Sequence, residues 1–100
     1  MYGLVGKMIA VKGKRDELIA ILIDGLSGLP GCLHHVVAKD VHDPDGIWIT
    51  EVWRDKKSHD DSLLLPAVQQ AIAKGKPLIA AFDSRFETEP VGGHGLGDEA

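Results

Sequence analysis

The chain carries a carboxylate, two tryptophans and a histidine within one short segment, GIWITEVWRDKKSH, residues 46–59. Glu51 and Trp53 are two residues apart, and His59 follows where a helical stretch begins. Residues two apart in a β-strand point to the same face, so Glu51 and Trp53 should lie side by side. A histidine can accept a proton near neutral pH, and a carboxylate can act as a base or orient such a histidine. The segment therefore predicts proton-transfer chemistry at the end of a strand.

Each of these residues also has a purely structural interpretation. Glu51 shares its strand face with Ile47 and Ile49, where a carboxylate is costly unless it is paired. An ion pair or helix-cap contact, with His59 or with a lysine across a dimer, would satisfy it. Trp53 could be an ordinary core aromatic rather than a substrate-stacking surface. His59 could be a surface histidine beside the two aspartates that follow it.

The remaining histidines and the single cysteine do not predict a metal site. His34 and His35 are adjacent in a predicted strand and point to opposite faces, so they cannot easily share one ion. His42 lies in a predicted loop and His94 in a glycine-rich tail, which leaves no spacing typical of metal ligands. Cys32 is most simply a small buried hydrophobic residue.

The pattern of apolar residues predicts the elements that must position these side chains. Leu18 and Leu22 are four residues apart and indicate an amphipathic helix, and Asp43-Pro44-Asp45-Gly46 indicates a turn between two strands. Pro66 should divide the second helical region into two pieces. We expect strands at 2–11, 32–40, 46–54 and 78–87, and helices at 14–28, 56–62 and 65–74. The order β-α-β-β-α-β predicts a ferredoxin-like α+β fold with an antiparallel sheet.

In such a fold the helices cover one face of the sheet and leave the other face open. Both faces of the predicted strands carry large apolar residues, with Trp48 and Val52 pointing away from Trp53. We place Phe82 and Phe86 on one face of the last strand because they are four residues apart. An open apolar sheet face usually marks an interface. A second copy of the chain, packed sheet to sheet as a homodimer, is the simplest partner.

The composition is that of a single globular domain of 100 residues, with 44% hydrophobic and 26% charged residues. We assign residues 1–88 to the domain and 89–100 to an acidic, glycine-rich C-terminal tail that is loose or lies against a partner. The net charge of −4 makes nucleic acid an unexpected partner. No apolar run approaches the roughly 18 residues of a membrane span, and we expect neither a signal peptide nor a membrane partner. A cytoplasmic location follows as an expectation.

Four short motifs then give the chain a family resemblance. They are Pro30-Gly31 before the second strand, Asp43-Pro44 in the turn, Glu51-x-Trp53 late in the third strand, and His59 at the next helix. In this order the motifs resemble the antibiotic biosynthesis monooxygenase domain family, over roughly residues 3–88. The resemblance implies a dimeric α/β barrel with a pocket in each subunit. It also implies oxygenase activity on quinols or polyphenols without metal or flavin, or, in another branch of the family, haem degradation.

The chain departs from the family pattern in two ways. Many members carry a tyrosine four residues after the glycine of Pro-Gly, where this chain has His35. Resemblance to the haem-degrading branch would require a triad of Asn, Trp and His. The chain contains no asparagine, and Leu63, ten residues after Trp53, stands where the histidine would be. The haem-degrading interpretation is therefore disfavoured.

The leading hypothesis is a cofactor-independent monooxygenase that oxidises a small aromatic quinol or polyphenol with O2. Proton transfer is assigned to His59 or His35, with Glu51 orienting a histidine and stabilising its charged form. The apolar wall of the site is assigned to Trp53, Ile49, Val37 and Phe82. No metal and no cofactor is expected. The alternative is a non-catalytic dimeric barrel protein that binds a hydrophobic metabolite or serves as a structural partner, because one fold supports many functions.

Overall fold

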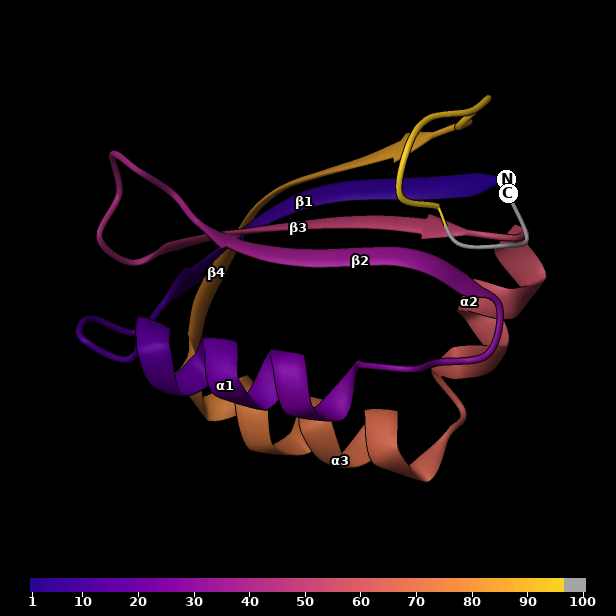
Figure 1. Ribbon diagram of the computed structural model, residues 1–100. Coiled ribbons are helices and arrows are strands. Elements are labelled where there is room, and N and C mark those ends of the chain that lie inside the picture. Colours follow the sequence, from indigo (N-terminus) through magenta and orange to yellow (C-terminus); the bar gives the residue numbers. More distant parts are fainter. Residues whose placement is uncertain (97–100) are drawn as a thin grey trace.

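The computed structural model of the protein describes residues 1–96 and consists of two layers, a twisted sheet and the helices beneath it (Figure 1). The strands are β1 (Tyr2–Ala10), β2 (Cys32–Lys39), β3 (Gly46–Trp53) and β4 (Ile79–Thr88). The helices are α1 (Arg15–Gly25), α2 (Lys56–Ser62), α3 (Pro66–Gly75) and the short 3-10 helix η1 (Lys76–Leu78). All strand pairs are antiparallel and the sheet order is β2-β3-β1-β4. This is the ferredoxin-like order that the sequence predicts.

Local sequence signals explain where the helices begin. The Asp55 side chain caps α2 by accepting a hydrogen bond from the backbone N–H of Ser58 at 2.7 Å. Pro66 occupies the first turn of α3, where its missing N–H costs nothing, and it separates α3 from α2 as the sequence predicts. Helix α1 ends at Gly25, three residues before the predicted end at 28, and the chain turns at Gly28, which has a φ of 68°.

The hydrophobic core lies between the sheet and the two longer helices. Leu18 and Leu22 of α1 pack against Ala10 of β1 and Ile47 of β3, and Leu18 and Ile47 are completely buried. Helices α1 and α3 touch where Gly25 faces Ala71, because the Ala71 Cα lies only 3.6 Å from where a Gly25 Cβ would be. A glycine is required at this point of closest approach.

The register of β4 corrects one sequence prediction. Lys7 pairs with Ser84 while Met8 pairs with Phe82, so Asp83 is an extra residue and forms a bulge. A second register shift follows between Ile9 and Ala10 of β1. Phe82 therefore shares the face of Met8, toward the helices, and Phe86 pairs with Val5 on the opposite face. Placing both phenylalanines on one face was wrong, because a bulge reverses the alternation.

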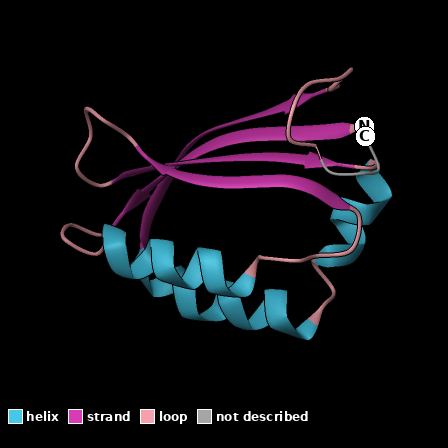
Figure 2. Ribbon diagram, in the orientation of Figure 1, coloured by secondary structure: helices cyan, strands magenta, loops and turns pink. Residues whose placement is uncertain are grey.

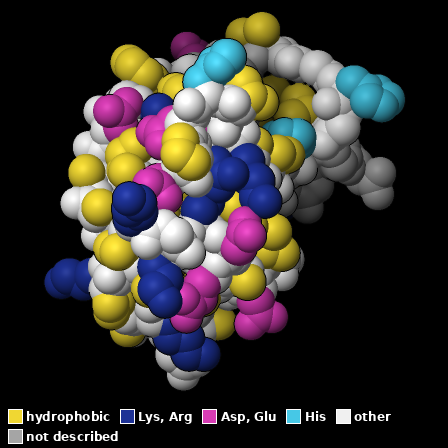
Figure 3. Space-filling view, turned by 90° about the vertical axis from the view of Figure 1, so that its left-hand side faces the viewer, with side chains coloured by type: hydrophobic (Ala, Val, Ile, Leu, Met, Phe, Trp, Pro, Cys, Tyr) yellow, Lys and Arg dark blue, Asp and Glu magenta, His cyan; other side chains and the backbone are white. Residues whose placement is uncertain are grey.

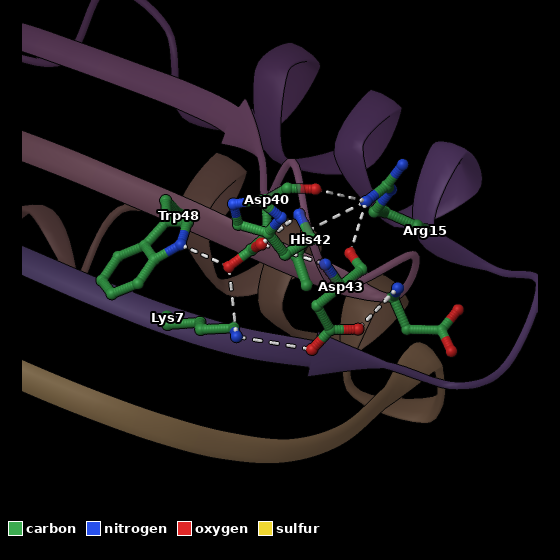
Figure 4. A network of polar contacts seen from close by, with 8 residues as sticks. Lys7, Arg15, Asp40, His42, Asp43 and Trp48 are labelled. Carbon is green, nitrogen blue, oxygen red and sulfur yellow. Dashed lines mark hydrogen bonds and ion pairs between the residues drawn. The ribbon is translucent and has the colours of Figure 1, made fainter.

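The turn between β2 and β3 is fixed by a polar network (Figure 4). One Asp40 oxygen accepts the backbone N–H groups of His42 and Asp43 at 2.8 and 3.0 Å. Its other oxygen accepts the indole N–H of Trp48 at 2.8 Å and pairs with the Lys7 ammonium at 3.2 Å. These contacts hold the pKa of the Asp40 carboxyl far below its usual range. Arg15 of α1 donates to three backbone carbonyls of the same turn, so the turn is tied to the helix layer.

One face of the sheet has no helix over it (Figure 2). The apolar side chains of this open face include Val36 and Phe86, which are 43% and 59% exposed. At the end of the molecule shown in Figure 3, acidic and basic side chains lie side by side, and Lys39 pairs with Asp16 at 3.0 Å. No helix within residues 1–96 is long and apolar enough to cross a membrane.

The predicted tail begins after β4. Its residues 89–96 contain no helix or strand, yet Leu96 is buried within this chain and the Pro90 ring lies close to Gly3. The described part of the tail therefore contacts the domain at Pro90, while residues 91–95 are exposed. Residues 97–100 of the predicted tail lie outside the described residues.

Candidate active site

The face of β3 that looks toward the helices borders a cavity of about 180 Å³ between the sheet and the helix layer. We call it the central cavity. Its polar side chains come from β2, β3 and α2, and most of its apolar side chains come from the helices and the loop before β2. The lining residues are Leu26, Leu29, His35, Glu51, Trp53, His59, Ser62, Leu63, Val68 and Ile72. Four sequence-predicted site residues, His35, Glu51, Trp53 and His59, are thus brought to one cavity.

Glu51 and Trp53 form a hydrogen-bonded pair within one strand. The Trp53 indole N–H donates to Glu51 Oε1 at 2.9 Å, and the Trp53 side chain is almost completely buried. This contact satisfies the only polar atom of the indole and one carboxylate oxygen. Neither the predicted pairing with His59 nor a lysine is needed to account for the position of Glu51.

His35 lies directly opposite Glu51 across the β2–β3 ladder. Side chains opposite one another in an antiparallel pair are neighbours on the same face. Burial lowers the pKa of the His35 imidazole, an effect that His34 reinforces, while the negative charge of Glu51 opposes it. The ring is therefore held neutral near pH 7, in the form that accepts a proton, next to a carboxylate that would stabilise the protonated form.

His59 reaches back from α2 toward the end of the sheet and packs between two aromatic rings. Its ring centroid is 5.5 Å from that of Trp53 in an edge-on arrangement and 5.4 Å from that of Tyr2. Its Nδ1 is 3.0 Å from an Asp60 oxygen, and its carbonyl accepts the Ser62 hydroxyl at 2.6 Å. The Asp60 contact involves only Nδ1 of His59 and does not engage the other ring nitrogen, Nε2.

A second cavity, of about 220 Å³, adjoins the central cavity through Glu51, which lines both. We call it the Gly6 cavity because Gly6 of β1 lies at its floor. The predicted wall residues Ile49 and Phe82 line this cavity. Val37, the fourth predicted wall residue, instead lines a groove beside the β2 edge together with His35. The predicted wall is therefore divided among three adjoining hollows.

Several lining residues had no signal in the sequence. Leu63 follows α2 and Val68 and Ile72 belong to α3, and the placement of these segments over β3 depends on tertiary packing. Tyr2 pairs across the sheet with Trp53, and its hydroxyl donates to Glu87 Oε2 at 2.7 Å. That hydrogen bond is the main reason why the pKa of Tyr2 is raised. A signal for the Glu51–Trp53 contact did exist, because Glu-x-Trp spacing puts both side chains on one face.

Within residues 1–96, no group of three or more His, Cys, Asp or Glu side chains lies close enough to hold a metal ion together. Cys32 is half-buried at the start of β2, and burial raises the pKa of its thiol. A raised pKa keeps the thiol protonated, so Cys32 is poorly suited to act as a nucleophile.

Four antiparallel strands in the ferredoxin-like order, with helices over one face, define a class of small α+β proteins. Within that class, the model of the antibiotic biosynthesis monooxygenase family matches residues 1–74. The chain belongs to this family. None of the curated proteins matches the chain significantly.

Solved structures agree with this assignment. A protein from Chloroflexus aurantiacus J-10-fl, named as a provisional antibiotic biosynthesis monooxygenase, is 64% identical to this chain. The match covers 96% of this chain and 98% of that protein, with a TM-score of 0.94. A similarly named protein from Deinococcus radiodurans is 26% identical, covers 93% and 95% of the two chains, and has a TM-score of 0.77. A Pseudomonas aeruginosa protein that is 17% identical covers 91% and 94%, has a TM-score of 0.78, and shares the fold.

Proposed function

We propose that the protein is a cofactor-independent monooxygenase that oxidises a small aromatic quinol or polyphenol with O2. The observation that carries the proposal is the central cavity, in which His35, Glu51 and His59 meet apolar walls beside the buried Trp53. Family membership and the similarly named structures support a monooxygenase in general. The quinol is what the family resemblance implies, and the proton-transfer groups of the cavity are compatible with it.

The reaction needs no external reductant when the substrate is a quinol. A hydroquinone and O2 together contain the atoms of a hydroxyquinone and one water, and the ring supplies all four electrons that O2 takes up. One oxygen atom enters the ring and the other leaves as water. An electron-rich phenolate can reduce oxygen itself, so the protein has to remove a proton, hold the ring and exclude water.

His35 is the better placed of the two candidate bases. Its lowered pKa keeps the ring neutral, and Glu51 faces it across the ladder and stabilises the imidazolium that forms when it takes the phenolic proton. His59 borders the same cavity, and with Trp53 it presents an aromatic wall against which the substrate ring can pack. Ile49, Val37 and Phe82 extend the apolar surroundings into the adjoining hollows.

The size of the cavity bears on the size of the substrate. Pockets for drug-sized ligands begin at about 300 Å³, and the central cavity is smaller. A substrate with one or two rings is therefore favoured over an extended polycyclic one. Residues 1–88 form the catalytic domain in this proposal, and residues 89–100 form the tail.

The open face of the sheet supports a homodimer in which a second copy covers it. Val36 and Phe86 on this face are large apolar side chains that are exposed to solvent, and a two-fold dimer would bury both copies of each. Sedimentation equilibrium tests this arrangement. A Phe86→Asp variant should sediment as a monomer while the wild type sediments as a dimer.

Incorporation of labelled oxygen tests the activity. Metal-stripped, flavin-free protein is incubated with a reduced naphthoquinone under heavy oxygen, and boiled protein corrects for spontaneous oxidation. One labelled atom in the product, above the boiled control, is expected. The label should fall to the control level in a Glu51→Gln, His35→Gln double variant and persist in His42→Gln, because His42 lies in the β2–β3 turn outside the cavities. Absence of label above boiled protein would reject a quinol monooxygenase and favour a ligand-binding protein.

A further inference from the structure

The Gly6 cavity exists because one residue in a row of three has no side chain. Gly6 of β1 lies between Ile49 of β3 and Arg85 of β4, and it pairs with both. With no side chain at the middle position, a hollow of about 220 Å³ opens between the neighbours. A Cβ at Gly6 would lie 3.3 Å from the Ser84 carbonyl oxygen, so the backbone of β4 also approaches closely here.

The hollow is mostly apolar but has an opposite charge at each side. Leu4, Met8 and Phe82 contribute apolar walls, Glu51 contributes a carboxylate, and Arg85 contributes a guanidinium. A few polar groups in an apolar pocket are what orients a bound small molecule. The arrangement therefore suits a flat ligand that carries an anionic group at one end and a hydrogen-bond donor at the other.

The Arg85 charge is available to such a ligand. Lys7 also borders the cavity, but its ammonium is 3.2 Å from Asp40 and 3.4 Å from Asp43 in the network of the β2–β3 turn. Within residues 1–96, no carboxylate lies at ion-pair distance from the Arg85 guanidinium, which interacts with the Tyr2 hydroxyl instead. The planar guanidinium matches a carboxylate with two parallel hydrogen bonds.

We propose that the quinol or polyphenol substrate is a phenolic acid, which lies across the Gly6 and central cavities with its carboxylate on Arg85 and a phenolic hydroxyl toward Glu51 and His35. This deepens the proposed function by naming the substrate class and rests on it. Glu51 lines both cavities, so a ligand in the Gly6 cavity reaches the carboxylate that faces His35. Arg85 is then a specificity-determining residue that fixes which end of the substrate reaches His35.

The net charge of the chain makes a preference for an acid over its ester informative. A protein with a net charge of −4 repels anions at long range, so it should bind an ester more readily than the corresponding acid unless a local cation reverses the order. A preference for the acid can therefore be attributed to a nearby cation rather than to the overall field of the molecule.

Equilibrium binding of para-hydroxycinnamate and its methyl ester, measured by titration calorimetry at pH 7 and low salt, tests the proposal. Both carry a phenol at one end, and only the acid carries a carboxylate at the other. The acid should bind about tenfold more tightly than the ester, as expected for a charge-assisted hydrogen bond. Arg85→Gln should abolish the preference without weakening the ester, and Arg85→Lys should keep part of it.

Lys12→Gln is the matched control, because it removes the same charge from an exposed loop and should leave the preference intact. Equal binding of acid and ester by the wild type, binding of neither, or a preference that survives in Arg85→Gln would overturn the proposal. The measurement needs no oxygen and no turnover. An acid preference without label incorporation from the reduced naphthoquinone would therefore reject the quinol monooxygenase and keep the phenolic-acid site, and label incorporation without the preference would do the reverse.

Discussion

Replacing Gly25 with alanine tests the contact that holds helices α1 and α3 together. Considered as part of an isolated helix, the substitution should stabilise, because alanine is favoured over glycine by about 1 kcal/mol in a helix interior and by less at an end. The structure predicts the opposite sign. A methyl group at Gly25 would overlap the Ala71 Cβ and lie 3.6 Å from the Ala71 Cα.

The magnitude follows from the stiffness of packed helices. Overpacking a close contact costs about 1–3 kcal/mol, and the propensity gain at the last residue of α1 offsets less than about 1 kcal/mol of it. The net loss of unfolding free energy should be about 1–2 kcal/mol. For a chain of this size, that lowers the thermal midpoint by about 4–16 °C. The double variant Gly25→Ala, Ala71→Gly removes the overlap and should be less destabilised than the two single changes added together.

Urea denaturation at one fixed protein concentration measures these differences. A fixed concentration matters because association of the proposed dimer would contribute to the apparent stability. Gly92→Ala is the control, since a Cβ there meets nothing within 4 Å and its effect should be close to zero. If Gly25→Ala is as stable as the wild type or more so, or if the two substitutions are simply additive, the helices do not touch at this point.

Three further predictions concern charge and core packing. Because its pKa is lowered, the Asp40 carboxylate stabilises the fold at pH values above 3.8, the ordinary pKa of the group, and this stabilisation is lost as the pH falls below that value. Asp40→Asn should therefore have a lower thermal midpoint than the wild type at neutral pH and approach it in acid. A difference in thermal midpoint that stays constant with pH would contradict this. Glu51→Gln should lower the pKa of His35 further, because it removes the negative charge that counteracts the lowering of this pKa by burial. An NMR titration in which the imidazole of the variant titrates at higher pH than in the wild type would refute the pairing. Ile47→Val should cost about 0.5–1.5 kcal/mol and Ile47→Ala about 2–5 kcal/mol in urea denaturation, since Ile47 is completely buried; equal costs would mean that the site collapses around the smaller residue.

The parts of the fold that depend on local chemistry could be predicted from the sequence. The break at Pro66, the turn before Gly46 and the alternation along β3 are all confirmed, because proline, turn residues and strand periodicity act within a few residues. The faces of β4 were mispredicted because its bulges depend on the partner strand. Nothing near Asp83 marks it as an extra residue, and one bulge is enough to send Phe82 and Phe86 to opposite faces.

The candidate site divides in the same way. Glu51 and Trp53 share a face by spacing alone, and their hydrogen bond follows from that. The position of His35 opposite Glu51 depends on the β2–β3 register, which includes a shift between Cys32 and His34 that the sequence does not reveal. The apolar lining from α3 could not be predicted, because helix placement is decided by contacts such as Gly25 with Ala71 between residues far apart in the chain.

The two tryptophans lie on opposite faces of one strand and give the protein two separate fluorescent reporters. Trp53 lines the central cavity and its ring lies edge-on to that of His59, so its emission should respond to a ligand bound there. Trp48 belongs to the open face, where its indole is bonded to Asp40 and lies 5.9 Å from the Lys7 ammonium. With Trp48→Phe and Trp53→Phe each leaving one emitter, the proposed ligand binding and the proposed dimerisation could be followed as independent optical signals without any added label.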